Sequence, residues 1–343
     1  MRAVIFDEFG AQPRVAEVDE PVVAADGALI RVTATGLCRS DWHGWSGHDD
    51  TVRVPHVPGH EFAGTVVSVG SSVRDWYGGE RVTVPFVCGC GSCEWCLAGQ
   101  MQVCPNQTQP GFTQWGSFAQ YVAVRFADTN LVAVPDSVSD QAAASLGCRF
   151  ATAYHALTSR ARLAAGEWIA VFGCGGVGLS AIMIAHALGA RVLAIDRSSA
   201  ALSLATNLGA DRTALADDVT PALIDQLTGG GAHVSVDAVG SPQTSADAIA
   251  SLRRRGRHVQ IGLIAGGRVE LPMDRIIGWE LDVLGSHGMP SSDYPDLLEL
   301  VSSGALRPDE LIGRTVGLEE AAALLPGWTP DDGAGMILID PAR

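Results

Sequence analysis

The stretch WIAVFGCGGVG, residues 168–178, decides the fold of the middle part of this 343-residue chain. Its first five residues are all apolar, which is typical of a parallel strand covered on both faces. The glycines that follow match the spacing G-x-G-x-x-G, and an apolar segment with helical character runs from about 177 to 188. A strand, a glycine-rich turn and a helix in this order predict the first βα unit of a parallel sheet.

The glycine-rich turn also predicts a dinucleotide site. The next apolar strand, 191–195, ends at Asp196. An acidic residue at that place accepts hydrogen bonds from ribose hydroxyls, and the helix N-terminus meets the pyrophosphate charge. Asp196 therefore favours NAD over NADP, although Arg197 beside it could hold a 2′-phosphate. A glycine-rich turn without nucleotide is the alternative. The candidate cofactor-binding residues are Gly173, Gly175, Gly176, Val177, Gly178, Asp196 and Arg197.

Further strands at 233–237 and 257–261 repeat the βα pattern, so residues 149–286 are expected to form a doubly wound parallel-sheet domain of the Rossmann type. The basic run Arg253–Arg255 is interpreted as a solvated helix end before a strand. Residues 1–148 contain short strands, such as 29–34 and 64–70, and predict an antiparallel β-rich domain. The tail, 287–343, is too small to be a domain and is expected to pack on residues 1–148.

Composition excludes several classes of function. The net charge is −15, and all 23 basic residues are Arg because the chain has no Lys. A nucleic-acid-binding face and any mechanism that needs a catalytic lysine are therefore disfavoured. Neither a secretory signal nor an apolar run of about 18 residues is visible, so a cytoplasmic protein without a membrane partner is expected.

The cysteines fall into two patterns. Five of them lie within one short lobe, residues 88–104, and four of these have the form C-x-x-C-x-x-C with a fourth cysteine soon after. Four thiolates suit a closed tetrahedral zinc site of structural type. Disulfides or free thiols are the alternatives. Cys88 is not expected to be a ligand. The predicted structural zinc ligands are Cys90, Cys93, Cys96 and Cys104.

Cys38, the pair His60-Glu61 and Cys148 are dispersed along the chain, and spacing alone cannot join them. The motifs around them do connect these residues. Along the chain they occur in a fixed order: GLCRSDWH (36–43), PGHEFAG (58–64), the cysteine lobe, Gly147-Cys148 and the glycine-rich turn. Together these motifs resemble the zinc-dependent alcohol dehydrogenases of the medium-chain dehydrogenase/reductase superfamily. The resemblance covers nearly the whole chain and implies a GroES-like catalytic domain beside the Rossmann domain.

The resemblance implies a catalytic zinc bound by Cys38, His60 and Cys148, with one position left open. Asp41 is implied to orient His60, and Glu61 to lie behind the ligands as an occasional further ligand. The other implied roles are cofactor pyrophosphate binding by Arg39, a proton relay of Ser40 and His43, and a substrate pocket lined by Phe86. Trp45 and Trp115 are further pocket candidates, with ordinary core packing as the alternative reading.

The activity implied is the reversible NAD-dependent oxidation of a primary, secondary or aromatic alcohol, with two zinc ions per chain. A polyol or other specialised alcohol dehydrogenase of the same superfamily is the near alternative. A zinc-stabilised binding protein without enzymatic activity is the distant one. A homotetramer is expected, with a homodimer as the alternative.

Overall fold

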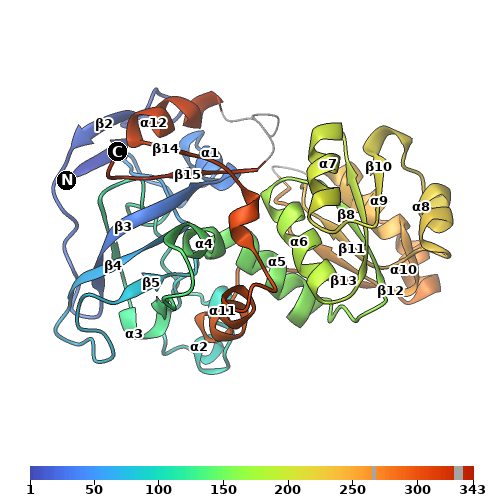
Figure 1. The fold of residues 1–343 in the computed structure, drawn as a ribbon, viewed down its shortest axis with the longest axis horizontal. Coiled ribbons are helices and arrows are strands. Elements are labelled where there is room, and N and C mark those ends of the chain that lie inside the picture. The colour runs from blue at the N-terminus through green and yellow to red at the C-terminus, as the bar shows by residue number, and fades with distance from the viewer. Residues whose placement is uncertain (265–267, 328–334) are drawn as a thin grey trace. The chain divides into compact units, whose positions relative to one another are not determined.

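The computed structural model describes residues 1–264, 268–327 and 335–343. These residues form two compact units, one of residues 1–151 with 288–343 and the other of residues 152–287 (Figure 1). Within the described ranges, no helix has both the length and the apolar character needed to cross a membrane.

The unit of residues 152–287 is built on a six-stranded sheet in which every strand pair is parallel. The strand order is β10 (Arg212–Leu215), β9 (Arg191–Asp196), β8 (Trp168–Phe172), β11 (Ala232–Asp237), β12 (Leu252–Gln260) and β13 (Asp282–Gly285). Counted from β8, this is the doubly wound order 3-2-1-4-5-6, so the predicted parallel sheet is confirmed. The chain reverses its winding between β8 and β11, and such sheets bind ligands outside the carboxyl ends of the strands at that point.

Helices connect the strands of this sheet: α6 (Gly176–Ala187), α7 (Ser199–Asn207), α8 (Pro221–Thr228), α9 (Pro242–Ala250) and α10 (Met273–Trp279). Strand β8 is buried at all five positions, as its apolar run predicts, and it occupies a central place in the sheet. The interpretation of Arg253–Arg255 as a helix end is wrong, because these residues form the exposed first half of β12. Because these side chains face water, this part of the strand has no apolar run, and the hydrophobic pattern of the sequence does not indicate a strand there.

The unit of residues 1–151 and 288–343 is β-rich, as expected. Its main sheet follows the order β14 (Ile312–Val316), β15 (Met336–Ile339), β3 (Ala28–Leu37), β4 (Phe62–Val69), β5 (Arg81–Thr83) and β7 (Val132–Ala133). The tail strand β15 pairs antiparallel with β3, so the C-terminal segment completes the sheet begun by the N-terminal one. Strand β6 (Tyr121–Val124) also pairs with β3, and β1 (Arg2–Ile5) pairs with β2 (Arg14–Glu17).

Short helices also belong to this unit. They are α1 (Arg39–Trp45), α2 (Glu94–Leu97), α3 (Ala127–Asn130), α4 (Asp140–Ser145), α11 (Tyr294–Ser302) and α12 (Leu318–Gly327). Helix α5 (Ala151–His155) continues the chain into the unit of residues 152–287. Between α4 and α5 the helix widens into a π-helical segment, Leu146–Phe150. Segments of this kind are rare and are frequent at functional sites.

The glycine-rich turn after β8 permits a direct test of the fold. A Cβ atom at Gly178 would lie 1.7 Å from the carbonyl oxygen of Gly173, whereas one at Gly175 would meet nothing within 4 Å. We expect Gly178→Ala to lower the free energy of unfolding by about 3 kcal/mol or more, since the backbone must move to admit the methyl group.

Gly175→Ala is the matched control, measured in the same thermal or denaturant unfolding experiment, and it should leave stability unchanged. Equal stability of the two variants would contradict this packing of the turn.

Candidate active site

Three segments of the first unit bring four potential metal ligands together. Cys38 follows the end of β3, His60 and Glu61 precede β4, and Cys148 lies in the π-helical segment. One ligand atom from each of these residues lies within 4.8 Å of all the others. The antiparallel pairing of β3 with β4 brings Cys38 near His60 and Glu61. At this end of the two strands the N–H of Gly36 donates to the Glu61 carbonyl at 2.7 Å.

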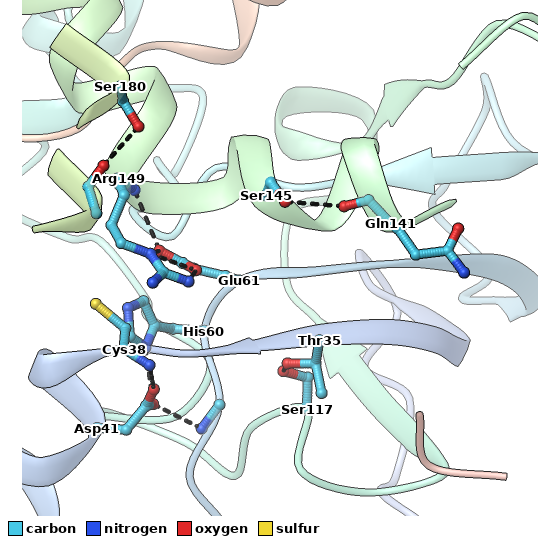
Figure 2. Close-up of polar contacts among 12 residues, drawn as sticks. Thr35, Cys38, Asp41, His60, Glu61, Ser117, Gln141, Ser145, Arg149 and Ser180 are labelled. Atoms are coloured by element: carbon cyan, nitrogen blue, oxygen red, sulfur yellow. Dashed lines mark hydrogen bonds and ion pairs between the residues drawn. The ribbon is translucent and has the colours of Figure 1, made fainter. Parts of the chain in front are cut away.

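Asp41 fixes the orientation of His60 (Figure 2). Its carboxylate is buried and accepts hydrogen bonds from His60 Nδ1 at 2.8 Å, the Gly59 N–H at 3.0 Å and the Cys38 N–H at 2.9 Å. Because Nδ1 is used in this way, Nε2 is the nitrogen left for another partner. A metal-binding histidine characteristically gives its second ring nitrogen to a carboxylate in this manner.

The donor atoms fit a zinc ion. Within the part of the chain that the structure describes, the Nε2 atom of His60 is buried without a hydrogen-bond partner. Such an orphaned polar atom costs free energy unless something occupies its lone pair. Two soft cysteine sulfurs and one imidazole nitrogen suit zinc, which is a borderline-soft ion, and zinc sites with one open position use this set.

The charge distribution agrees with a cation at this place. A hydrogen bond from the Cys148 thiol lowers the pKa of Cys38 well below its usual range, and the same bond raises the pKa of Cys148. Burial opposes a charge on His60, but the Asp41 carboxylate outweighs it and raises the pKa of the imidazole. Cys38 therefore favours the thiolate, while Cys148 and His60 hold their protons, and a metal ion takes the place of such protons when it binds.

Glu61 forms a buried ion pair with Arg149, a residue that the sequence reasoning missed. The Nε atom of Arg149 lies 2.9 Å and 3.0 Å from the two carboxylate oxygens of Glu61, and its Nη2 donates to Oε2 as well. Burial raises the pKa of Glu61, while the guanidinium acts against that shift. A Cβ atom at Gly36 would lie 2.4 Å from the Glu61 carboxylate, so this position of β3 needs a glycine to admit the pair.

Aromatic rings flank His60. The Phe86 ring lies 6.1 Å from the imidazole, centroid to centroid, and the Phe112 ring lies 5.1 Å away. Trp45 packs in the same hydrophobic cluster as Phe112, and its Nε1–H donates to the Ala11 carbonyl at 2.6 Å. Trp115 packs against a different cluster and donates to the Pro55 carbonyl at 3.1 Å. A place for either tryptophan in a substrate pocket therefore rests on the sequence alone.

Helix α1 carries the expected relay and cofactor residues. Ser40 and His43 are three positions apart, so they share one face of the helix, and both are half-buried. Burial lowers the pKa of His43, and the Arg39 guanidinium lowers it further. Arg39 itself is exposed at the first position of α1. Its expected contact with the pyrophosphate stays a prediction.

The four cysteines of the lobe form the second group of metal ligands. The sulfurs of Cys90, Cys93, Cys96 and Cys104 all lie within 4.8 Å of one another. Asn130 anchors the lobe by accepting from the Gly89 N–H at 2.8 Å and donating to the Gly89 carbonyl at 2.9 Å. Cys88 lies outside the group, and its thiol contacts the Pro85 carbonyl. Among the described residues, which include every cysteine, none is joined in a disulfide.

The glycine-rich turn has the geometry of an anion site. Gly173 adopts φ +93°, which favours glycine, and α6 begins at Gly176 with Gly175 exposed before it. Both carboxylate oxygens of Asp196 accept backbone N–H groups, from Cys174 at 2.6 Å and from Ser198 at 2.8 Å. Asp196 thereby joins the end of β9 to the turn, while Arg197 is exposed. Ribose binding by Asp196 stays a prediction.

Two protein-family models match this chain. Residues 24–136 match the family model described as alcohol dehydrogenase GroES-like domain, and residues 176–303 match the one described as zinc-binding dehydrogenase. An alcohol dehydrogenase of Geobacillus stearothermophilus is 33% identical over 328 residues, 93% of either chain. A D-arabitol-phosphate dehydrogenase of Enterococcus avium is 33% identical over 311 residues, 89% of this chain and 87% of that protein.

Solved structures agree with these matches. A structure described as a zinc-binding dehydrogenase of Sinorhizobium meliloti 1021, bound to NADP, superposes with a TM-score of 0.89 at 29% identity and covers 99% of both chains. The expected combination of a GroES-like domain with a Rossmann domain is thus confirmed. From its motifs, its two groups of zinc-type ligands and these relatives, the chain belongs to the zinc-dependent alcohol dehydrogenases of the medium-chain dehydrogenase/reductase superfamily.

Proposed function

We propose that this protein is an NAD-dependent zinc alcohol dehydrogenase that oxidises an alcohol to an aldehyde or ketone, and catalyses the reverse reaction. The observation that carries the proposal is the buried Nε2 of His60, which lacks a partner among the described residues, on a histidine that is grouped within 4.8 Å with the thiols of Cys38 and Cys148. Cys38, His60 and Cys148 would bind the catalytic zinc, and the four lobe cysteines a structural one.

The chemistry supplied by a bound zinc is Lewis-acid polarisation, which lowers the pKa of a hydroxyl group. The chemistry supplied by a bound nicotinamide is acceptance of the hydride. The chain provides the rest. Asp41 holds the His60 imidazole in place, and the Glu61–Arg149 pair stays buried behind the ligands. The Ser40 hydroxyl accepts the proton of the substrate hydroxyl as it releases its own toward His43. His43, whose ordinary pKa is near 6.5, exchanges a proton with solvent.

The aromatic surroundings of His60 favour an apolar substrate. Phe86 and Phe112 offer carbon surface beside the imidazole and no hydrogen-bond partner for further hydroxyl groups. The relative that acts on D-arabitol phosphate, at the same identity as the alcohol dehydrogenase, supports the polyol alternative. The homotetramer and the cytoplasmic location expected from the sequence remain predictions.

The decisive experiment is a screen of primary, secondary, aromatic and polyhydric alcohols with NAD and with NADP, followed at 340 nm. We expect reduction of NAD with apolar alcohols, loss of activity with a chelator and its return with zinc. Preference for polyols would replace the substrate class only. Absence of any alcohol-dependent reduction, despite two bound zinc ions, would favour the non-enzymatic binding protein.

Zinc content separates the two metal sites. Cys38→Ser replaces a thiolate by a poor zinc ligand, so we expect the loss of one zinc per chain and of turnover, with little change in the unfolding midpoint. Cys93→Ser should also remove one zinc but should lower the midpoint markedly, because the lobe has little core of its own. Metal analysis and thermal unfolding check both variants, and unaltered zinc content in either would refute its assignment.

The proton relay predicts an effect on turnover alone. Ser40→Ala should lower kcat by a factor of about 10² or more, since it removes the hydroxyl that moves the proton. Zinc content and the unfolding midpoint should not change. Ser40→Thr keeps a hydroxyl and is expected to recover most of the activity; if it were as slow as the alanine variant, loss of the hydroxyl could not be the cause.

Cofactor choice depends on the charge of Asp196. Asp196→Asn keeps an oxygen for the Cys174 N–H but removes the negative charge that repels a 2′-phosphate. We expect the ratio of kcat/KM for NADP to that for NAD to rise at least about tenfold, the factor that corresponds to 1.4 kcal/mol. Gly175→Ala, which leaves Asp196 in place, should weaken both cofactors together. An unchanged ratio in Asp196→Asn would show that the ribose is recognised elsewhere.

A further inference from the structure

His48 has no role in the mechanism above, yet it lies directly against the relay histidine. The Nδ1 atoms of His43 and His48 are 3.0 Å apart, and the two ring centroids are 5.3 Å apart. At that distance one nitrogen must carry a proton and donate it to the other. His43 is half-buried and His48 is exposed, so the pair leads from the interior of the site to solvent.

Ser46 offers the Nδ1 atom of His48 a second partner. Its Oγ lies 3.1 Å from that nitrogen and donates its own hydrogen to the His43 carbonyl, also at 3.1 Å. The serine oxygen is therefore left as an acceptor. When His48 Nδ1 is bare, it can accept from His43; when it is protonated, it can donate to Ser46. Both protonation states of His48 are thus hydrogen-bonded without movement of the chain.

The backbone and a tryptophan fix the two rings. The His48 N–H donates to the His43 carbonyl at 3.0 Å across a turn in which Gly47 has φ +78°. The Trp42 indole lies edge-on to both imidazoles, with centroids 5.0 Å from His43 and 5.3 Å from His48. Rings held in this way are preorganised for proton transfer, which requires a hydrogen bond before the transfer.

The charges around His43 suit a group that holds a proton only briefly. Burial, then Arg39 and then His48 lower the pKa of His43, whereas Cys38 and Asp49 act in the opposite direction. A neutral His43 with its hydrogen on Nδ1 is ready to accept at Nε2 and to donate toward His48.

We propose that His48 is the terminal residue of the proton relay, receiving at Nδ1 the proton that His43 releases from its own Nδ1 and passing protons to water from Nε2. The proposal rests on the proposed dehydrogenase activity. In each transfer the Nδ1–H bond of His43 breaks and an Nδ1–H bond forms on His48. His43 stays neutral, because a proton arrives at its Nε2. No electrons are transferred in this step.

The test measures proton release directly. The zinc-loaded enzyme is mixed with NAD and alcohol in weak buffer with a pH indicator, and proton release is recorded beside NADH formation. His48→Gln should slow proton release about tenfold, and added imidazole should restore the rate by carrying the proton in place of the missing ring. His186→Gln, which removes an exposed histidine of α6, is the matched control and should behave as wild type.

A double variant separates the relay from a structural effect. If His48 acts through His43, then His43→Gln/His48→Gln should release protons no more slowly than His43→Gln alone. Unfolding midpoints and zinc content are compared for every variant. His48→Asn provides a second replacement if the glutamine variant is unstable.

The outcomes are distinct. A wild-type enzyme without alcohol-dependent NADH formation would overturn the proposed function and the relay with it. An active wild type whose His48→Gln variant releases protons at the full rate would overturn the relay alone. Slow release that imidazole does not restore would do the same, because it would reveal a structural role for His48.

Discussion

The hydrogen bond between His60 Nδ1 and Asp41 is the constraint on which the site depends. It selects which ring nitrogen is left for a metal, and it ties the residues before β4 to helix α1. Asp41 also accepts the N–H of Cys38, the residue that caps α1, so one carboxylate sets the position of two of the three proposed ligands. The reciprocal bonding at this helix start is the capping-box arrangement, with Asp41 as the third residue of the helix.

The burial of charge around these ligands has a consequence for stability. The Glu61–Arg149 pair and the Asp41–His60 pair are almost fully withdrawn from water. Removal of one member of a buried pair typically costs about 3–5 kcal/mol, because the other charge is left without compensation. Two backbone positions without side chains, Gly36 and Gly147, make room for Glu61. The site is thus part of the core of its unit rather than a feature added to its surface.

What the sequence could predict follows from how local each feature is. The turn from β8 into α6 and the cysteine lobe are each contained in one short stretch, so spacing alone indicated their chemistry. The pair of Glu61 with Arg149 joins residues 88 positions apart, and neither has a local motif that points to the other. Arg149 does follow a proposed ligand directly, which was the one signal available. Phe112 gave none, since an aromatic residue in an irregular segment has no periodicity to place it.

The outer strands of the parallel sheet were missed for a related reason. Strands β10 and β13 lie at its two edges and are largely exposed, so their residues carry no continuous apolar run. The central strands are buried on both faces, so their residues form continuous apolar runs that can be recognised in the sequence.

Helix α1 shows how one short helix can carry several proposed functional residues with different roles. Successive side chains of a helix turn by 100°, so Asp41 can face the buried ligands while Ser40 and His43, three positions apart, share another face. The capping residue Cys38 adds a proposed ligand at the start of the same helix, and the turn after it adds His48. The position of two proposed ligands and the proposed proton transfer then both depend on this short helix. A distortion of α1 would disturb both at once, whereas a change in the turn that carries His48 would reach the proton path and leave the ligands in place.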